Sequence, residues 1–218
     1  MTTTTTPFAD NGLTVVDRTD RATIFELSGG RRLAVIHPPH ATTAPKGAAL
    51  VRTALNILQS VDSVRRTASA DKTLSELGRS ERVKPVQAAA RTALAEVHAD
   101  LATFAGEVAG LEKSVYAPPA LDPADAVGAM VDLELRSWIR ALKGEQRAKA
   151  LDNLAKEPRM LEAVVRSPTK LGEFSEFSGT LWRERVEATH PQAPALARQQ
   201  EALAYVTNLL PHFDNVIG

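Results

Sequence analysis

The chain contains no cysteine among its 218 residues. Disulfide bonds, thiolate nucleophiles and zinc–thiolate centres are therefore excluded, and an intracellular origin is favoured. Catalytic signatures are missing too, because the phosphate-binding patterns GxxxxGKS/T and GxGxxG and the nucleophile pattern GxSxG do not occur. From these absences we predict a protein that is not an enzyme, with no catalytic residues, no metal site and no cofactor.

The chain also lacks an excess of either charge, since 26 basic residues balance 26 acidic ones. General binders of nucleic acid or of membrane surfaces use a surplus of Lys and Arg, so neither class is favoured. No apolar run approaches the roughly 18 residues needed to span a bilayer. The first residues, MTTTTTPFADNG, lack the basic start and apolar centre of a signal peptide. We expect a cytoplasmic or virion location.

Residues 1–40 differ in composition from the rest of the chain. Residues 1–12 form a Thr-rich arm, which is either a disordered tail or a segment held by a neighbouring subunit. Residues 13–40 contain three short apolar runs, LTVVDR, ATIFEL and RRLAVI, and Gly29-Gly30 suits a tight turn between two of them. The pattern predicts a three-stranded antiparallel meander. Phe25 and Leu27 should share a face, as should Leu33 and Val35.

The hydrophobic period then changes from two to about 3.5, which indicates helices. We expect a first helix over 46–69, a polar link with a short helical turn over 71–84, and a long helix over 86–116 with Pro85 in its first turn. Together these helices predict an antiparallel hairpin spanning 46–116.

An apolar seam with heptad spacing runs along the long helix. A helix of 30 residues rises about 45 Å and its partner about 35 Å, so the hairpin alone should leave one or two turns of the seam uncovered. Either the helices of the second half or another copy of the chain must cover the remainder. The seam, which we predict to be an interface, consists of Leu94, Val97, Leu101, Phe104, Val108, Leu111 and Val115, continued by Ala90.

The opposite side of the long helix is made of small residues. A glycine inside a helix costs about 1 kcal/mol relative to alanine. The close approach of a second backbone would explain why small residues stand on this side despite that cost. Alanine as a good helix former is the competing explanation. We infer contact on two sides of the helix and predict a second interface, the small-residue back, at Ala95, Ala102, Gly106, Ala109 and Gly110.

The region 122–218 reads as a cluster of shorter helices punctuated by proline. Asp122 can cap the first of them, with Pro123 at its first position. Residues 169–178 are expected to be a loop in which Phe174 and Phe177 serve either the core or a partner, and HFDNVIG is expected to be a tail. The inner stripe of the first helix should comprise Val127, Met130, Val131, Leu135, Trp138 and Leu142.

Few residues suggest metal binding or nucleic-acid binding. In His37-Pro38-Pro39-His40 the prolines fix a geometry that does not chelate, and further ligands are missing. Two short helices in 145–166 resemble a helix-turn-helix, but Glu157-Pro158 replaces the usual small-residue turn. An alternative function is therefore an intracellular helical regulator that binds protein or nucleic acid through the 134–170 surface. Its candidate basic residues are Arg136, Arg140, Arg147, Lys149 and Arg166.

The stretch RSWIRALKGEQRAKALDNLAKEPRMLEAVVRSPTKLGEFS, residues 136–175, resembles segments of uncharacterised phage and prophage proteins. In those segments an R-x-W/L-I/L-R-x-L helix precedes D-P-x-x-L-x-A-V-L-R-x-P, and here Glu157-Pro158 stands at the D-P step. The resemblance covers less than a fifth of the chain. It implies a phage-encoded or virion-associated protein, and it brings no active site with it.

Together these patterns predict a mainly α protein. It should contain a long antiparallel helical hairpin, a cluster of short helices and a small N-terminal antiparallel β meander. The function we expect is that of a non-enzymatic structural or adaptor protein that packs into a larger assembly such as a phage virion. Its partners would be other protein subunits, in a homo-oligomer or a multi-protein assembly, while nucleic acid and membrane are not expected.

Overall fold

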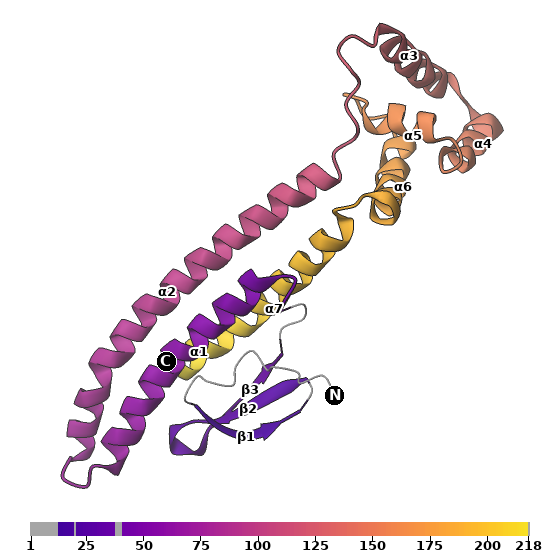
Figure 1. Ribbon diagram of the computed structural model, residues 1–218. Helices are drawn as coiled ribbons and strands as arrows, with labels where there is room; N and C mark the ends of the chain where they lie inside the picture. The colour runs from indigo at the N-terminus through magenta and orange to yellow at the C-terminus, as the bar shows by residue number, and fades with distance from the viewer. Residues whose placement is uncertain (1–12, 20, 38–40, 218) are drawn as a thin grey trace. The chain divides into compact units, whose positions relative to one another are not determined.

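The computed structural model describes residues 13–19, 21–37 and 41–217, so the predicted N-terminal arm lies outside the described residues. The described residues form seven helices and one three-stranded sheet, which confirms the mainly α fold (Figure 1). They group into two compact units. The first unit comprises the described residues up to 109 together with 195–217, and the second comprises 110–194. The last helix therefore groups mostly with the hairpin, whereas the sequence had placed it in the second cluster.

The meander is confirmed as an antiparallel sheet. Its strands β1 (Thr14–Arg18), β2 (Ala22–Glu26) and β3 (Arg32–Ile36) pair in chain order. Gly29 and Gly30 have φ of +77° and +73° in the short turn between β2 and β3, which glycine adopts without steric strain. The predicted apolar face is buried at Phe25, Leu27, Leu33 and Val35.

Helix α1 (Pro45–Ala70) supports this sheet through a buried carboxylate. Asp62 is only 4% exposed; it accepts hydrogen bonds from the Ser28 backbone N–H at 2.6 Å and from Arg66 Nε at 2.7 Å. Burial disfavours the charged carboxylate, but these hydrogen bonds outweigh it and hold the pKa of Asp62 below its usual value. Arg66 also donates to the Glu26 carbonyl. One carboxylate thus ties the β2–β3 turn to α1.

Helices α1 and α2 (Glu76–Val115) form the predicted antiparallel hairpin, and Lys46 near the start of α1 pairs with Glu107 far along α2. Helix α2 begins ten residues earlier than predicted. The Ser75 hydroxyl accepts from the Gly78 N–H and caps the new start. Pro85 consequently lies inside the helix, so its placement in a first turn was wrong.

Helix α7 (Ala193–Ile217) is the third long helix of the first unit. It continues through Pro211 to Ile217, so the predicted tail HFDNVIG is helical over residues 212–217. The last carbonyls of α7 find donors, since Arg65 donates to the Val216 and Ile217 oxygens at 2.9 and 3.0 Å and Gln87 donates to Ile217 at 3.1 Å. These hydrogen bonds explain why the helix persists to its end.

The second unit contains α3 (Ala126–Ala141), α4 (Gly144–Leu154), α5 (Pro158–Val165) and α6 (Glu173–Thr189). Phe174 and Phe177 lie in the first turns of α6, so the predicted loop over 169–178 ends earlier than expected. Phe174 is fully buried, whereas Phe177 is exposed. The buried core of this unit consists of Ile139, Leu142, Ala150, Leu154, Met160, Leu161, Val164, Leu171 and Phe174.

Candidate interaction surface on helix α3

The seam of α2 is covered by the chain itself. Leu94, Val97, Phe104 and Val108 are no more than 3% exposed within the single chain. Val115 is buried as well, and Leu101 and Leu111 are half-buried. Of the two covers considered for the seam, the second-half helices and another copy of the chain, the burial within one chain favours the first. Helix α1 alone is too short to face α2 over its whole length. Helix α7 belongs mostly to the same unit and contacts α2, since Asp214 pairs with His98 and the Ile217 carbonyl accepts from Gln87.

The small-residue back of α2 is exposed to solvent. This holds for every residue assigned to it, and a Cβ added at Gly106 or Gly110 would meet no atom within 4 Å. No element of the described chain packs closely against these two glycines. Contact with a second protein chain at this back stays a prediction.

Four of the five candidate basic residues of the 134–170 surface have partners within the second unit. Arg147 stacks on the Phe174 ring with its guanidinium carbon 5.1 Å from the centroid and also pairs with Glu173. Lys149 pairs with Glu145, and Arg140 donates to the Thr169 hydroxyl. The side chain of Arg166 is only 10% exposed and is bound in a network described below. Half-buried Arg136 completes the set.

Helix α3 is rotated about its own axis relative to the prediction. Much of its expected inner stripe lies in solvent, with Val127 73%, Met130 63% and Trp138 49% exposed. Val131 is exposed as well. Only Leu142 is buried as expected, and Leu135 is half-buried. The assignment of the stripe to the core was therefore wrong for four of its six residues.

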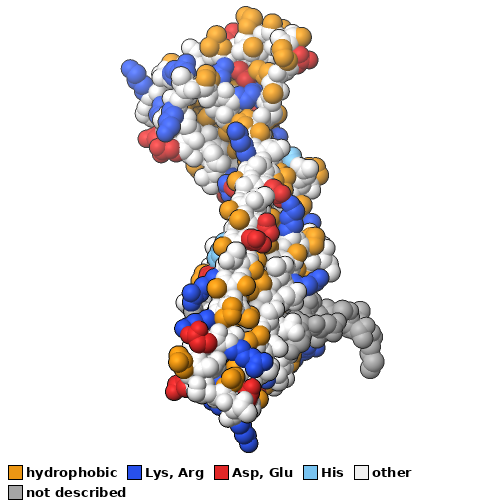
Figure 2. Space-filling view, turned by 90° about the vertical axis from the view of Figure 1, so that its left-hand side faces the viewer, with side chains coloured by type: hydrophobic (Ala, Val, Ile, Leu, Met, Phe, Trp, Pro, Cys, Tyr) orange, Lys and Arg blue, Asp and Glu red, His pale blue; other side chains and the backbone are white. Residues whose placement is uncertain are grey.

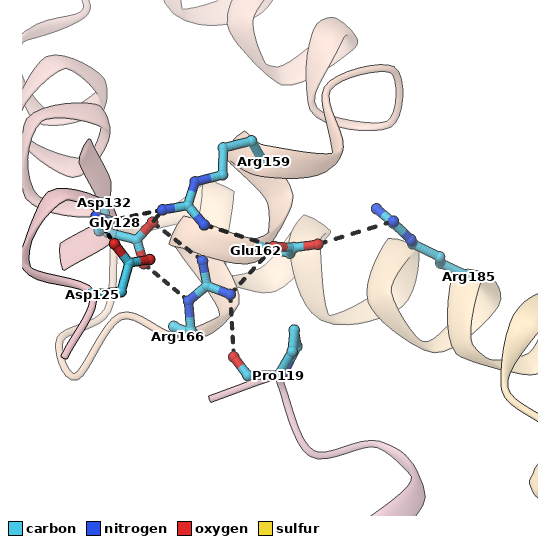
Figure 3. A network of polar contacts seen from close by, with 8 residues as sticks. All are labelled: Pro119, Asp125, Gly128, Asp132, Arg159, Glu162, Arg166 and Arg185. Atoms are coloured by element: carbon cyan, nitrogen blue, oxygen red, sulfur yellow. Dashed lines mark hydrogen bonds and ion pairs between the residues drawn. The ribbon is translucent and has the colours of Figure 1, made fainter. Parts of the chain in front are cut away.

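A buried carboxylate explains this orientation (Figure 3). Asp132 on α3 is 1% exposed and receives Arg166 in bidentate fashion, with Nε–Oδ2 at 2.9 Å and Nη2–Oδ1 at 3.2 Å. Arg159 adds a contact to Oδ1 at 2.9 Å and donates to the Gly128 carbonyl at 2.9 Å. A buried charge requires such partners, so α3 must turn Asp132 toward α5. Its apolar stripe, on the other side of the helix, then faces outward.

Further contacts hold the two arginines in place. Arg166 Nη1 donates to the Pro119 carbonyl at 3.1 Å and to Glu162 Oε2 at 3.3 Å, while Arg185 approaches the other oxygen of Glu162 at 4.0 Å. Burial lowers the pKa of Arg166, but the hydrogen bonds to Asp132 and Glu162 outweigh it and raise that pKa above its ordinary value. Arg166 therefore stays charged at physiological pH, and its hydrogen bonds to Asp132 fix α3 on α5.

The outer side of α3 consequently carries mostly apolar side chains, and this surface, the α3 face, includes a tryptophan. Figure 2 shows hydrophobic side chains gathered over this helix, at the top of the view. Monomeric proteins rarely expose large contiguous apolar patches, and such patches commonly mark interaction sites. Within α3, which the structure describes in full, Glu134 is the one charged residue between these apolar side chains. The large residues of the face are Val127, Met130, Val131, Leu133 and Trp138.

No family model matches the chain, and no curated protein or solved structure is significantly similar to it. The α3 face and its network are therefore interpreted from their own chemistry.

The Asp132 network was not predicted from the sequence, although the sequence contains a signal for it. Arg159, Glu162 and Arg166 follow one another at i, i+3 and i+7, so they share one side of α5. Two arginines and one glutamate on one side of a short helix leave an excess of positive charge, which a carboxylate from a neighbouring helix can pair. Asp132 interrupts the amphipathic pattern of α3 on the side away from Val127 and Trp138, and it is that neighbour.

Other candidate sites among the described residues offer fewer grouped polar side chains. A hollow of about 290 Å³ between α1 and α2 is lined largely by apolar atoms, including Leu50 and Phe104, with Lys46 and Glu107 at its edge. His98 pairs with Asp214 at 3.0 Å, and His37 Nε2 lies 2.9 Å from the Thr23 hydroxyl. In the described part of the chain, no three acidic or histidine side chains gather closely enough to hold a metal ion. None of the helices described combines the length and hydrophobicity that a membrane crossing requires.

Proposed function

We propose that this chain is a non-enzymatic structural or adaptor protein that docks onto other protein subunits through the α3 face. The exposed apolar side chains of α3 are the observation that carries this proposal. The α2 seam cannot carry it, because the chain covers that seam itself. The resemblance of residues 136–175 to phage and prophage proteins makes a virion the assembly in which we place it.

The arrangement of α3 supports a docking role because it is costly without a partner. Each large apolar side chain left in water forgoes about 1.5–3 kcal/mol that burial would supply. The Asp132 network holds the helix in this orientation nevertheless, through two arginines from α5. A helix fixed rigidly with its apolar side outward is prepared for a partner and has little ordering entropy left to lose on binding.

The test is the size of the complex that contains the protein in its native source. The wild-type chain and a variant with Val127→Ser, Met130→Ser and Trp138→Ser are compared by sedimentation of gently prepared extracts. We expect the wild type in a fraction much larger than the free chain, and the triple variant in the free fraction. Phe177→Ser, an exposed aromatic on α6, is the matched control and should leave the complex intact.

Two results would contradict the proposal. One is a wild-type protein that sediments as the free chain. The other is a triple variant that stays in the large complex, since the α3 face would then not be the docking surface.

A further inference from the structure

We propose that the second unit binds a small organic phosphate in a hollow between the end of α5, the loop that follows it and the first half of α6. The hollow has a volume of about 320 Å³. Small-molecule sites in proteins occupy about 300–1,000 Å³, so the space suits a small ligand. The proposal is independent of the α3 face, because different elements of the same unit form this hollow.

Helix α6 forms one side of the hollow. Ser175, Ser178, Gly179 and Trp182 line it at the spacing i, i+3, i+4 and i+7, so they share one face of the helix. The indole Nε1–H of Trp182 donates to the Tyr116 carbonyl at 2.9 Å, and this hydrogen bond fixes the orientation of the half-buried ring. The hollow therefore contains a fixed aromatic ring against which a flat apolar group can pack.

Hydrogen-bond donors that have not found an acceptor gather at the same hollow. The Ser175 hydroxyl accepts from the Leu171 N–H at 2.7 Å, and the Thr169 hydroxyl accepts from Arg140 Nη2 at 3.0 Å. Each hydroxyl keeps its own O–H to donate, and neither finds an acceptor for it among the described residues. The exposed Lys170 ammonium, which has no ion-pair partner in the described part of the chain, adds further donors and a full positive charge.

The charge of the lining favours an anion, and its donor types favour phosphate. None of the described residues that line the hollow carries a carboxylate, and Arg140 places a second positive charge beside the Thr169 hydroxyl. The planar fork of an arginine matches a carboxylate best, whereas a lysine acts as a point charge. An ammonium with separate hydroxyl donors is therefore better suited to the tetrahedral oxygens of a phosphate. The flat part of the ligand would pack against Trp182.

Gly179 explains how the hollow stays open. Glycine within a helix is less stable than alanine by about 1 kcal/mol. A Cβ added at Gly179 would meet no atom within 4 Å, so packing within the described chain does not require glycine there. Because Gly179 lines the hollow, a side chain at this position would take up part of its space. A ligand that needs this space accounts for the glycine.

The experiment is a fluorescence titration of the purified full-length chain with the substitution Trp138→Phe, which leaves Trp182 as the one tryptophan. The probes are phenyl phosphate, inorganic phosphate, benzoate and benzyl alcohol, all at the same ionic strength. We expect a saturable change in Trp182 emission with phenyl phosphate. Inorganic phosphate and benzoate should each bind about tenfold more weakly, because one lacks the flat group and the other the tetrahedral anion. Benzyl alcohol should cause no saturable change.

Two further substitutions locate the site. Lys170→Met should weaken the binding of phenyl phosphate about tenfold or more, because a charge-assisted contact is lost. Lys156→Met removes an exposed charge elsewhere in the same unit and should leave binding unchanged. Gly179→Leu should abolish binding by filling the hollow, whereas Thr180→Leu, at the exposed neighbouring position, should not. Thermal unfolding separates a filled hollow from a damaged fold, since Gly179→Leu should be at least as stable as the parent chain.

The absence of a saturable change with phenyl phosphate at millimolar concentration would overturn the inference. So would binding that Lys170→Met and Gly179→Leu both leave unchanged. Benzyl alcohol that binds as tightly as phenyl phosphate would show that the hollow does not recognise an anion. Benzoate that binds more tightly would show that the anion is not a phosphate. None of these results alters the docking test of the α3 face, so the two proposals fail separately.

Discussion

At the scale of single residues, Asp62 is the polar side chain on which the packing of the sheet depends most. Asp62→Ala should lower the free energy of unfolding by about 2 kcal/mol, because the Ser28 N–H and Arg66 lose their acceptor. Urea unfolding followed by circular dichroism measures this loss of stability, with Glu96→Ala on the exposed surface of α2 as the control.

The contribution of Asp62 to stability should also depend on pH, with a definite sign. The folded pKa of Asp62 lies below its unfolded value, near 3.9, so its stabilisation is complete above that pH and is lost on acidification. The difference between wild type and variant should therefore shrink as the pH falls below about 4, and a difference that grows would contradict this account.

Asp132 gives the corresponding residue-scale prediction for the second unit. Asp132→Ala leaves the guanidinium groups of Arg159 and Arg166 without their shared carboxylate, and breaking a buried pair in this way costs about 3–5 kcal/mol. Near-ultraviolet circular dichroism reports on this unit, because both tryptophans, Trp138 and Trp182, lie in it. Glu134→Gln is the matched control two residues away, and it should change the stability of the isolated chain by less than about 0.5 kcal/mol. Equal effects of the two substitutions would contradict the assigned role of Asp132.

At the scale of elements, the small-residue back of α2 allows a test of whether that side faces water. Gly106 has a helical environment and open space around it, so Gly106→Ala should raise the stability of the isolated chain by about 1 kcal/mol. Thermal unfolding measures this, and the reverse exchange Ala102→Gly should lower stability by a similar amount. A loss of stability in Gly106→Ala would show that another backbone already packs closely there.

Element by element, the sequence predicted helices and strands well where periodicity was strong. The meander followed from alternating runs and Gly29-Gly30, and the hairpin followed from the spacing around Leu58 and Leu94. Helix ends were harder to predict, because they depend on hydrogen bonds from afar: Arg65 and Gln87 sustain the end of α7. The orientation of α3 could not be read from its hydrophobic pattern at all, since the position of Asp132 decides it through contacts with α5.

At the scale of the whole molecule, the candidate site changed place between sequence and structure. Heptad spacing on α2 correctly identified side chains that require cover, such as Phe104 and Val108, but spacing alone does not say whether that cover comes from the same chain. The sequence analysis assigned α7 to the second cluster, so the prediction left out a helix that belongs mostly with the hairpin. The interaction surface of this account is instead an amphipathic helix held by charges on its inner side and left apolar on its outer side.

The measurement that tests this account most directly is hydroxyl-radical footprinting of Met130 and Trp138, two readily oxidised side chains of the α3 face. The isolated chain at high dilution is compared with the same protein in its native assembly, and oxidation is located by mass spectrometry. We expect strong oxidation of both residues in the dilute chain and marked protection in the assembly, while Phe177 is oxidised equally in the two states. Equal oxidation of Met130 and Trp138 in both states would show that nothing covers the α3 face, and it would contradict the central claim.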